Sequence, residues 1–160
     1  MKNLLIILIS KLISYTIKKV KKGSGSTWPG HIALKLNPNF IKHILSKNPS
    51  LKIILVGGTN GKTTTATMLK FCLEKNGFKV LQNNSGANLL NGIASIIALN
   101  SSTLSRLDFD AAIFEVDENS LPDVLDYITP NALILLNLFR DQLDRYGEVN
   151  SIVTEWKKAI

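Results

Sequence analysis

Residues 51–65 have the sequence Leu51-Lys-Ile-Ile-Leu-Val-Gly-Gly-Thr-Asn-Gly-Lys-Thr-Thr-Thr65. An apolar run suited to a buried strand ends at two glycines, and a helix-compatible segment, 66–73, follows the Gly-Lys-Thr. A strand, a glycine-rich loop and a helix in this order form the setting that a phosphate-binding loop requires. Glycines let backbone N–H groups converge on phosphate oxygens, and the helix N-terminus adds partial positive charge. We therefore predict a nucleotide phosphate site here rather than a structural turn.

The residues of this predicted phosphate loop have separate roles. We expect the phosphates of a nucleotide to be bound by Gly58, Thr59, Asn60, Gly61, Lys62, Thr63 and Thr64. The Lys62 ammonium is suited to the terminal phosphates, and the Thr63 hydroxyl is suited to Mg²⁺. Val56 stands where the usual eight-residue pattern has its first glycine, so the loop is the shorter Gly58–Thr63.

Further strands and helices alternate after this loop. Apolar runs predict strands at 79–82, 111–116 and 132–136. Helix-compatible segments occur at 62–76, 89–99, 122–127 and 151–160. Near-continuous apolar strands joined by helices are typical of a parallel sheet covered on both faces, so the predicted fold class is α/β. Polar residues follow each strand, and sites in such sheets lie beyond the strands' carboxyl ends. We therefore expect one shared cleft.

Several polar side chains are candidates for that cleft. Glu115 ends a buried strand and is our preferred Mg²⁺ ligand opposite Thr63, with Asp117 and Glu118 as open alternatives. The competing interpretation of Glu115 is a capped or salt-bridged acid at a strand end. Candidate substrate-binding residues are Asn84, Asn88, Asn137 and Arg140. Two interpretations of Arg140 and Arg145 remain equally open: one of them steadies phosphate oxygens, or both belong to a solvated helix start with Arg/Asp pairs.

The net charge of +7 is a property of the N-terminal third. Residues 1–50 contain nine lysines and no Asp or Glu, whereas residues 51–160 contain ten Lys or Arg against twelve Asp or Glu. A basic leader favours an anionic partner, either membrane lipid or nucleic acid. No nucleic-acid motif accompanies it, so membrane lipid is favoured and no nucleic acid is expected.

Residues 1–22 predict a basic amphipathic helix. One stripe of that helix is formed by Ile6, Ile9, Ile13, Ile17 and Val20. Three interpretations remain open: the helix packs on its own protein or a partner, it lies on a membrane surface, or it is a signal or anchor segment. Its longest unbroken apolar run, 4–9, is too short to span a bilayer.

The predicted domain organisation has three parts: the helix at 1–22, a linker and short helix at 23–50, and the nucleotide-binding domain at 51–160. Within the second part we expect a loop at 23–30, a short strand or turn at 32–36 and a helix at 38–47 capped by Asn37. The single cysteine, Cys72, is expected to be a buried packing residue, which fits a reducing compartment. The last helix, capped near Ser151, has no stop signal, so we expect the protein to continue and the domain to be partial.

The phosphate loop and the strand ends resemble those of the Mur ligase superfamily, whose members are amide-bond-forming ligases of cell-wall and folate metabolism. The loop Gly58–Thr63 has the family's Gly-Thr-Asn-Gly-Lys-Thr, and Glu115 matches a strand-end Glu that typically helps to bind Mg²⁺. Most members then carry Asn, a few residues and Asp-His-Leu-Asp. Here Asn137 is followed by Asp-Gln-Leu-Asp, so Gln142 replaces the histidine.

With Gln142 at this position, the chain resembles the MurT family within the superfamily. Segments 83–88, 115–118 and 137–148 and the leader through 27–35 share the likeness. The resemblance implies ATP-dependent amidation of the D-glutamate of lipid II to D-isoglutamine, with ammonia from a GatD-like glutaminase partner. It implies a cytoplasmic location at or near the inner face of the membrane. The family's zinc ribbon and C-terminal domain are absent from these 160 residues, so we expect Zn²⁺ and the main ligase residues, if present, downstream.

Three alternatives remain. Another Mur-type ligase would add an amino acid to a UDP-MurNAc-peptide or to folate, against which Gln142 and the Asn-rich loop argue. A non-ligase P-loop ATPase on a membrane predicts the full eight-residue loop, which Val56 denies. A fragment that serves only as a binding module is the third.

Overall fold

A computed structural model of the chain describes residues 2–20, 27–83, 86–139 and 149–160. Its centre is a parallel sheet in the order β2-β3-β1-β4. The strands are β1 (Lys52–Gly57), β2 (Val80–Gln82), β3 (Ala111–Val116) and β4 (Ala132–Leu135). In this register Gly57 of β1 lies level with Val116 of β3 and Leu135 of β4, so the carboxyl ends of three strands meet at one edge. The predicted α/β class is confirmed.

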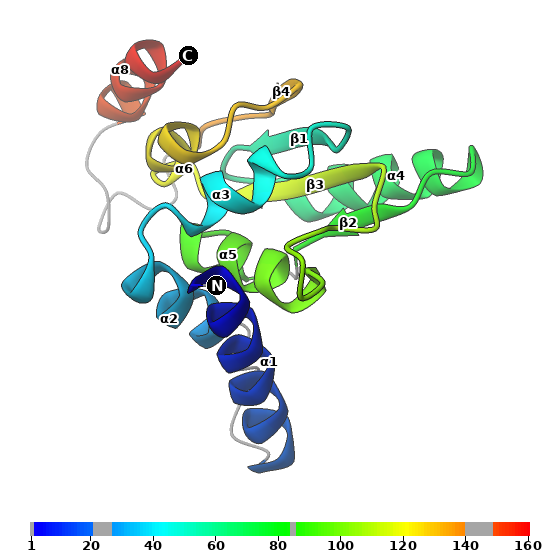
Figure 1. Cartoon of the computed structure of the whole chain (residues 1–160). Helices are drawn as coiled ribbons and strands as arrows, with labels where there is room; N and C mark the ends of the chain where they lie inside the picture. The colour runs from blue at the N-terminus through cyan, green and yellow to red at the C-terminus, as the bar shows by residue number, and fades with distance from the viewer. Residues whose placement is uncertain (1, 21–26, 84–85, 140–148) are drawn as a thin grey trace.

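Helices cover both faces of the sheet (Figure 1). On one face lies α4 (Lys62–Lys75), and α5 (Leu90–Asn100) lies on the other. Successive residues of a strand point to opposite faces. Val56 accordingly packs with Ala66 of α4, whereas Leu55 belongs to the larger core that contains Ile93 of α5. The remaining described helices are α6 (Leu121–Tyr127) and α8 (Val149–Ala159), which pack together, and three helices from the N-terminal third.

Those three helices are α1 (Lys2–Val20), α2 (Trp28–Leu36) and α3 (Phe40–Ser46). They extend the core beyond α5, and α1 and α2 lie side by side against that helix (Figure 1). The N–H of Gly30 donates to the Ser95 hydroxyl at 2.7 Å. A Cβ at Gly30 would lie 1.9 Å from the carbonyl oxygen of Asn91, so only glycine lets α2 approach α5 this closely. The described residues before β1 are therefore packed structure.

Some local predictions in this region were wrong. The segment 32–36, expected as a strand or turn, belongs to α2, and so do residues 28–30, which we expected in a loop. Pro29 is suited to a first helical turn, and Ala33 is buried, so packing selected the helix. The helix expected from 38 starts at Phe40 with Asn39 at the N-cap. The Asn37 side chain instead accepts the Asn39 N–H at 3.2 Å.

Two predictions further along the chain were also wrong. Cys72 is exposed on α4, because the buried stripe of that helix passes through Ala66 instead. The last helix begins at Val149, so Ser151 lies inside it and is not its cap. Other predictions are confirmed, including β3 with its predicted bounds and the end of α4 before Gly77, whose φ is +86°. The division of the chain at residues 22 and 50 stays a prediction.

No helix in the described ranges is long and apolar enough to cross a membrane. The Ile stripe of α1 packs on its own protein: Ile6 is buried, and Ile9, Ile13 and Ile17 are half-buried. The first of the three interpretations of this helix therefore holds for that stripe.

The packing of α3 can be tested by truncating Phe40, which is fully buried in the main core. Phe40→Ala is expected to lower the free energy of unfolding by about 3–5 kcal/mol, because it leaves a cavity. The matched control is Phe71→Ala on α4, where the ring is 60% exposed and the expected change is within about 0.5 kcal/mol. Urea denaturation measures both. Equal, small effects would mean that α3 is not part of the core.

Candidate functional site

The phosphate loop connects β1 to the first turn of α4. Two of its glycines have φ values that other residues rarely adopt, +142° at Gly58 and +87° at Gly61. A Cβ at Gly58 would also lie 2.9 Å from the carbonyl oxygen of Asn137. Thr64 follows in the exposed first turn of α4. The leading N–H groups of a helix have no intrahelical acceptor, so this turn is suited to an anion.

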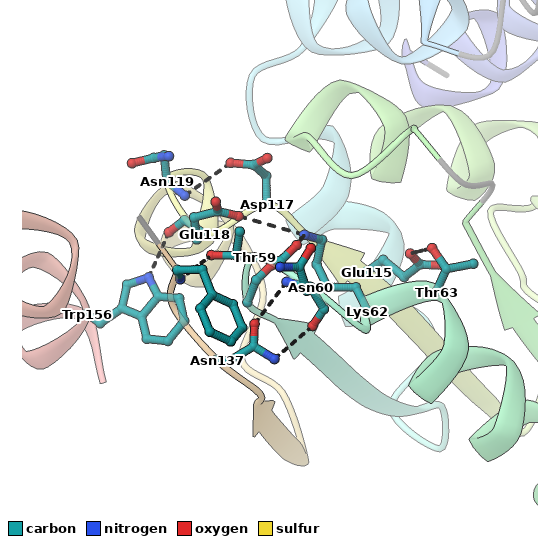
Figure 2. Close-up of polar contacts among 12 residues, drawn as sticks. Thr59, Asn60, Lys62, Thr63, Glu115, Asp117, Glu118, Asn119, Asn137 and Trp156 are labelled. Carbon is teal, nitrogen blue, oxygen red and sulfur yellow. Dashed lines mark hydrogen bonds and ion pairs between the residues drawn. The ribbon is translucent and has the colours of Figure 1, made fainter. Parts of the chain in front are cut away.

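Lys62 is the first residue of α4 and folds back over the loop. Its ammonium donates to the carbonyl oxygens of Gly58 and Thr59, the second at 2.8 Å. It also lies 3.7 Å from a carboxylate oxygen of Glu118, whose side chain is 4% exposed (Figure 2). The ammonium is therefore held at the loop by two carbonyl dipoles and one buried carboxylate, close to where terminal phosphates would lie in a P-loop.

Thr63 and Glu115 join the start of α4 to the end of β3. The Thr63 hydroxyl donates to a Glu115 carboxylate oxygen at 2.6 Å (Figure 2). Gln82 of β2 donates to the other oxygen at 3.3 Å. Glu115 is only 3% exposed. Hydroxyl and carboxylate oxygens suit Mg²⁺. The pair therefore fits a Mg²⁺ ion in the chemistry of its oxygen ligands.

Asn83, which belongs to the predicted strand-end segment 83–88 but was not one of the named substrate candidates, fixes the position of Glu115. Its side-chain oxygen accepts the Glu115 N–H at 2.8 Å, and its amide nitrogen donates to the Glu115 carbonyl at 2.9 Å. The same amide donates to the Ala87 carbonyl at 2.8 Å, so it also holds the backbone at Ala87. The signal that could have found it is the Asn83-Asn84 pair directly after the short predicted strand at 79–82.

The three candidate acids after β3 have different environments. Glu115 contacts Thr63, and Glu118 faces Lys62. Asp117 accepts the N–H of Asn119 at 3.2 Å and thus stabilises the turn before α6. Geometry favours Glu115 for a metal and gives Glu118 a separate role beside the lysine, which the sequence did not indicate.

Asn137 follows β4 and holds the phosphate loop. Its side-chain oxygen accepts the Asn60 N–H at 2.9 Å, and its amide donates to the Asn60 carbonyl at 3.1 Å (Figure 2). Its own carbonyl accepts the Thr59 N–H at 2.8 Å. The Thr59 hydroxyl in turn accepts the Phe139 N–H at 3.0 Å. Two loop N–H groups are thus used to clamp the loop, which leaves phosphate contacts to the turn at Gly61–Thr64.

The remaining candidates are placed less fully. Asn88 is half-buried, and its carbonyl accepts the Asp117 N–H at 3.0 Å. Asn84 and Arg140 lie outside the described residues. The substrate roles of these three and of Asn137 stay predictions. Trp156 of α8 adds an unforeseen contact, because its indole N–H donates to the Glu118 carbonyl at 2.7 Å (Figure 2).

The fold and the loop define a P-loop-type α/β domain. Residues 56–160 match the sequence profile of the Mur ligase middle domain. The chain belongs to the Mur ligase family.

Curated relatives include the lipid II isoglutaminyl synthase (glutamine-hydrolyzing) subunit MurT of Staphylococcus aureus strain COL. It is 34% identical over 152 residues, which cover 95% of this chain and 33% of that protein. The MurT subunit of Streptococcus pneumoniae is 41% identical over 127 residues, which cover 79% and 27%. A UDP-N-acetylmuramoylalanine–D-glutamate ligase of Buchnera aphidicola is 34% identical over 106 residues, which cover 66% and 21%.

Among solved structures, MurF from Acinetobacter baumannii superposes with a TM-score of 0.63 at 23% identity and covers 81% of this chain and 28% of that one. This likeness supports the fold. The chain spans 33% of the length of the MurT relative from S. aureus. The activity, substrates and partners of the whole protein are therefore matters for proposal.

The clamp on the loop can be tested with Asn137→Ala. Loss of two hydrogen bonds, each worth about 0.5–1.5 kcal/mol, is expected to speed hydrogen exchange at the Asn60 amide by about tenfold or more. The matched control is Asn131→Ala at the other end of β4, whose side chain accepts the Ile53 N–H at 2.8 Å. That variant should speed exchange at Ile53 and leave Asn60 unchanged. Unchanged exchange at Asn60 in Asn137→Ala would contradict the clamp.

Proposed function

We propose that this chain is the ATP-binding part of an ATP-dependent carbon–nitrogen ligase that amidates the D-glutamate of lipid II to D-isoglutamine. The observation that carries the proposal is the pairing of Thr63 with Glu115 beside Lys62, at the level carboxyl ends of β1 and β3. The comparisons support the proposal, because the MurT subunits of S. aureus and S. pneumoniae are 34% and 41% identical to this chain over most of its length.

The proposed reaction has two steps. A carboxylate oxygen of the substrate attacks the terminal phosphorus of ATP, so ADP leaves and an acyl phosphate forms. Ammonia then attacks the acyl carbon, phosphate leaves and a proton is lost to give the amide. Little of this requires covalent participation by the protein, which contributes position and charge.

Each site residue has a defined part in that scheme. The first turn of α4 supplies N–H donors to the phosphates, and the Lys62 ammonium moves from its carbonyl partners to the terminal phosphate oxygens. Thr63 and Glu115 would hold Mg²⁺, which supplies neutralising charge to the phosphates when bound. Glu118 keeps the ammonium at the loop in the absence of phosphate.

The proposed partners follow from the same relationship. The MurT relatives are named as subunits of a glutamine-hydrolysing synthase, so a GatD-like glutaminase is the proposed source of ammonia. The proposed location is the cytoplasm, near the membrane that carries the lipid-linked substrate. Among the described residues no group of three or more His, Cys, Asp or Glu could hold a metal ion.

A second candidate function is the addition of an amino acid to a nucleotide-linked precursor. The 34% identity to a UDP-N-acetylmuramoylalanine–D-glutamate ligase favours it, although that match covers 66% of the chain. The two functions differ in the nucleophile, ammonia or an amino acid.

The assignment of the metal ligand can be tested with two matched variants. Glu115→Gln removes the charge beside Thr63 and is expected to raise the Mg²⁺ concentration for half-maximal ATP binding by about tenfold or more. Glu118→Gln, which changes the acid beside Lys62, should leave that concentration nearly unchanged. Calorimetric titration of the full-length protein measures both. The reverse ranking would transfer the metal role to Glu118.

The reaction itself can be tested with the full-length protein, a glutaminase partner, ATP, glutamine and lipid II. Conversion of one carboxyl group to a carboxamide, followed by mass spectrometry, is the expected result, and Lys62→Ala should abolish it. Replacing glutamine by free ammonium should restore amidation without the partner. Ligation of an amino acid with no amidation would favour the second candidate function.

A further inference from the structure

The helix α1 has two apolar faces on opposite sides. One face is packed: Ile6 and Ile7 are 2% and 0% exposed against the protein's core. The other, which we call the leucine face, consists of Leu4, Leu5, Leu8, Leu12 and Tyr15. Their exposed fractions are 38%, 59%, 48%, 62% and 63%. Residues four apart lie on one side of a helix, so these side chains form one continuous stripe.

The leucine face exposes several neighbouring apolar side chains, which is more apolar surface in one place than scattered surface leucines provide. Single exposed leucines are common on soluble proteins, but a contiguous row marks an interaction surface. The helix also extends away from the sheet, and α8 beside the phosphate loop lies at the opposite side of the molecule (Figure 1). A partner on α1 would therefore leave the candidate site accessible.

Lysines lie at both ends of this face. Lys2 is exposed at the start of α1 and Lys19 near its end, whereas the Lys11 ammonium donates to the Ser101 carbonyl at 2.7 Å. Residues 1–50 contain no Asp or Glu. The Lys19 ammonium lies 6.0 Å from the centre of the Tyr15 ring, which places a cation at the border of the stripe. An apolar stripe bordered by lysines matches a surface that is itself apolar inside and anionic outside.

A hollow of about 510 Å³ adjoins the start of the stripe. It is lined in part by Lys2, Leu4, Asn37, His43, Lys47 and Leu104. Two lysines line this hollow and no acid is among its lining residues in the described part of the chain. Leu104, which is 76% exposed, lies on its rim. Cationic and amide groups beside exposed leucines suit an anionic headgroup whose acyl chains lie alongside the leucine face.

We propose that α1 lies in the plane of a membrane surface that contains anionic lipid, with the leucine face toward the acyl chains and the hollow at Lys2 and Lys47 toward a headgroup. The Ile stripe, by contrast, attaches the helix to its own domain. The charge pattern favours a lipid surface over a second copy of the chain, because two copies would bring two lysine-rich faces together. This inference does not depend on the proposed ligase reaction.

The experiment uses the full-length protein and co-sedimentation with vesicles of phosphatidylcholine alone or with added phosphatidylglycerol. The protein should bind the anionic vesicles and bind the neutral ones at least about tenfold more weakly, with binding reduced by added salt. The triple variant Leu5→Ser, Leu8→Ser, Leu12→Ser should lose that binding. The matched control, Met68→Ser with Phe71→Ser, changes exposed apolar residues of α4 and should bind like wild type.

Further measurements separate the lipid from other occupants of the leucine face. The double variant Lys2→Gln, Lys47→Gln should bind the anionic vesicles more weakly than wild type does, and its binding to the neutral vesicles should be unchanged. Binding of the triple variant at the wild-type level would overturn the proposal. A lower melting temperature, or a dimer that dissociates in the triple variant, would do the same, because the leucine face would then be covered by protein.

Discussion

The hydrogen bond between Thr63 and Glu115 is the contact on which the candidate site depends. It exists because β1 and β3 are parallel neighbours in a register that places Val56 beside Glu115, so α4 begins directly above the end of β3. Alternation along β3 turns Glu115 to the face that α4 covers, with Ile113 two residues earlier in the core beneath that helix. Gln82 and Asn83 at the end of β2 then fix the carboxylate and its backbone.

The phosphate loop is held by its neighbours as much as by its own sequence. Asn137 after β4 clamps the backbone of Asn60, and the close approach at Gly58 excludes a side chain. Glu118 provides a buried carboxylate for Lys62, and Trp156 of α8 supports the Glu118 backbone. A loop prepared in this way pays little ordering entropy when a phosphate binds, since its conformation already exists.

Much of this arrangement could be predicted from the sequence, because strand, loop and helix leave local signals. The bounds of β3 and the end of α4 at Gly77 are local in this sense. The helix α2 was mistaken for a loop and strand because its stability comes from packing on α5, through Gly30 and Ser95. The roles of Asn83 and Glu118 were missed for a similar reason: each depends on a partner from another element. The leucine face of α1 became visible only when the Ile stripe was found to be packed.

The most direct test of the site is the position of a divalent cation in a crystal of the full-length protein with Mn²⁺ and a non-hydrolysable ATP analogue. Anomalous scattering identifies the ion without reference to the protein model. We expect one ion bound to the Thr63 hydroxyl at about 2.0–2.3 Å, with Glu115 as a direct or water-mediated ligand. We also expect the Lys62 ammonium to leave Glu118 for the terminal phosphate. An ion bound by Glu118, with the Thr63–Glu115 hydrogen bond intact, would contradict this assignment.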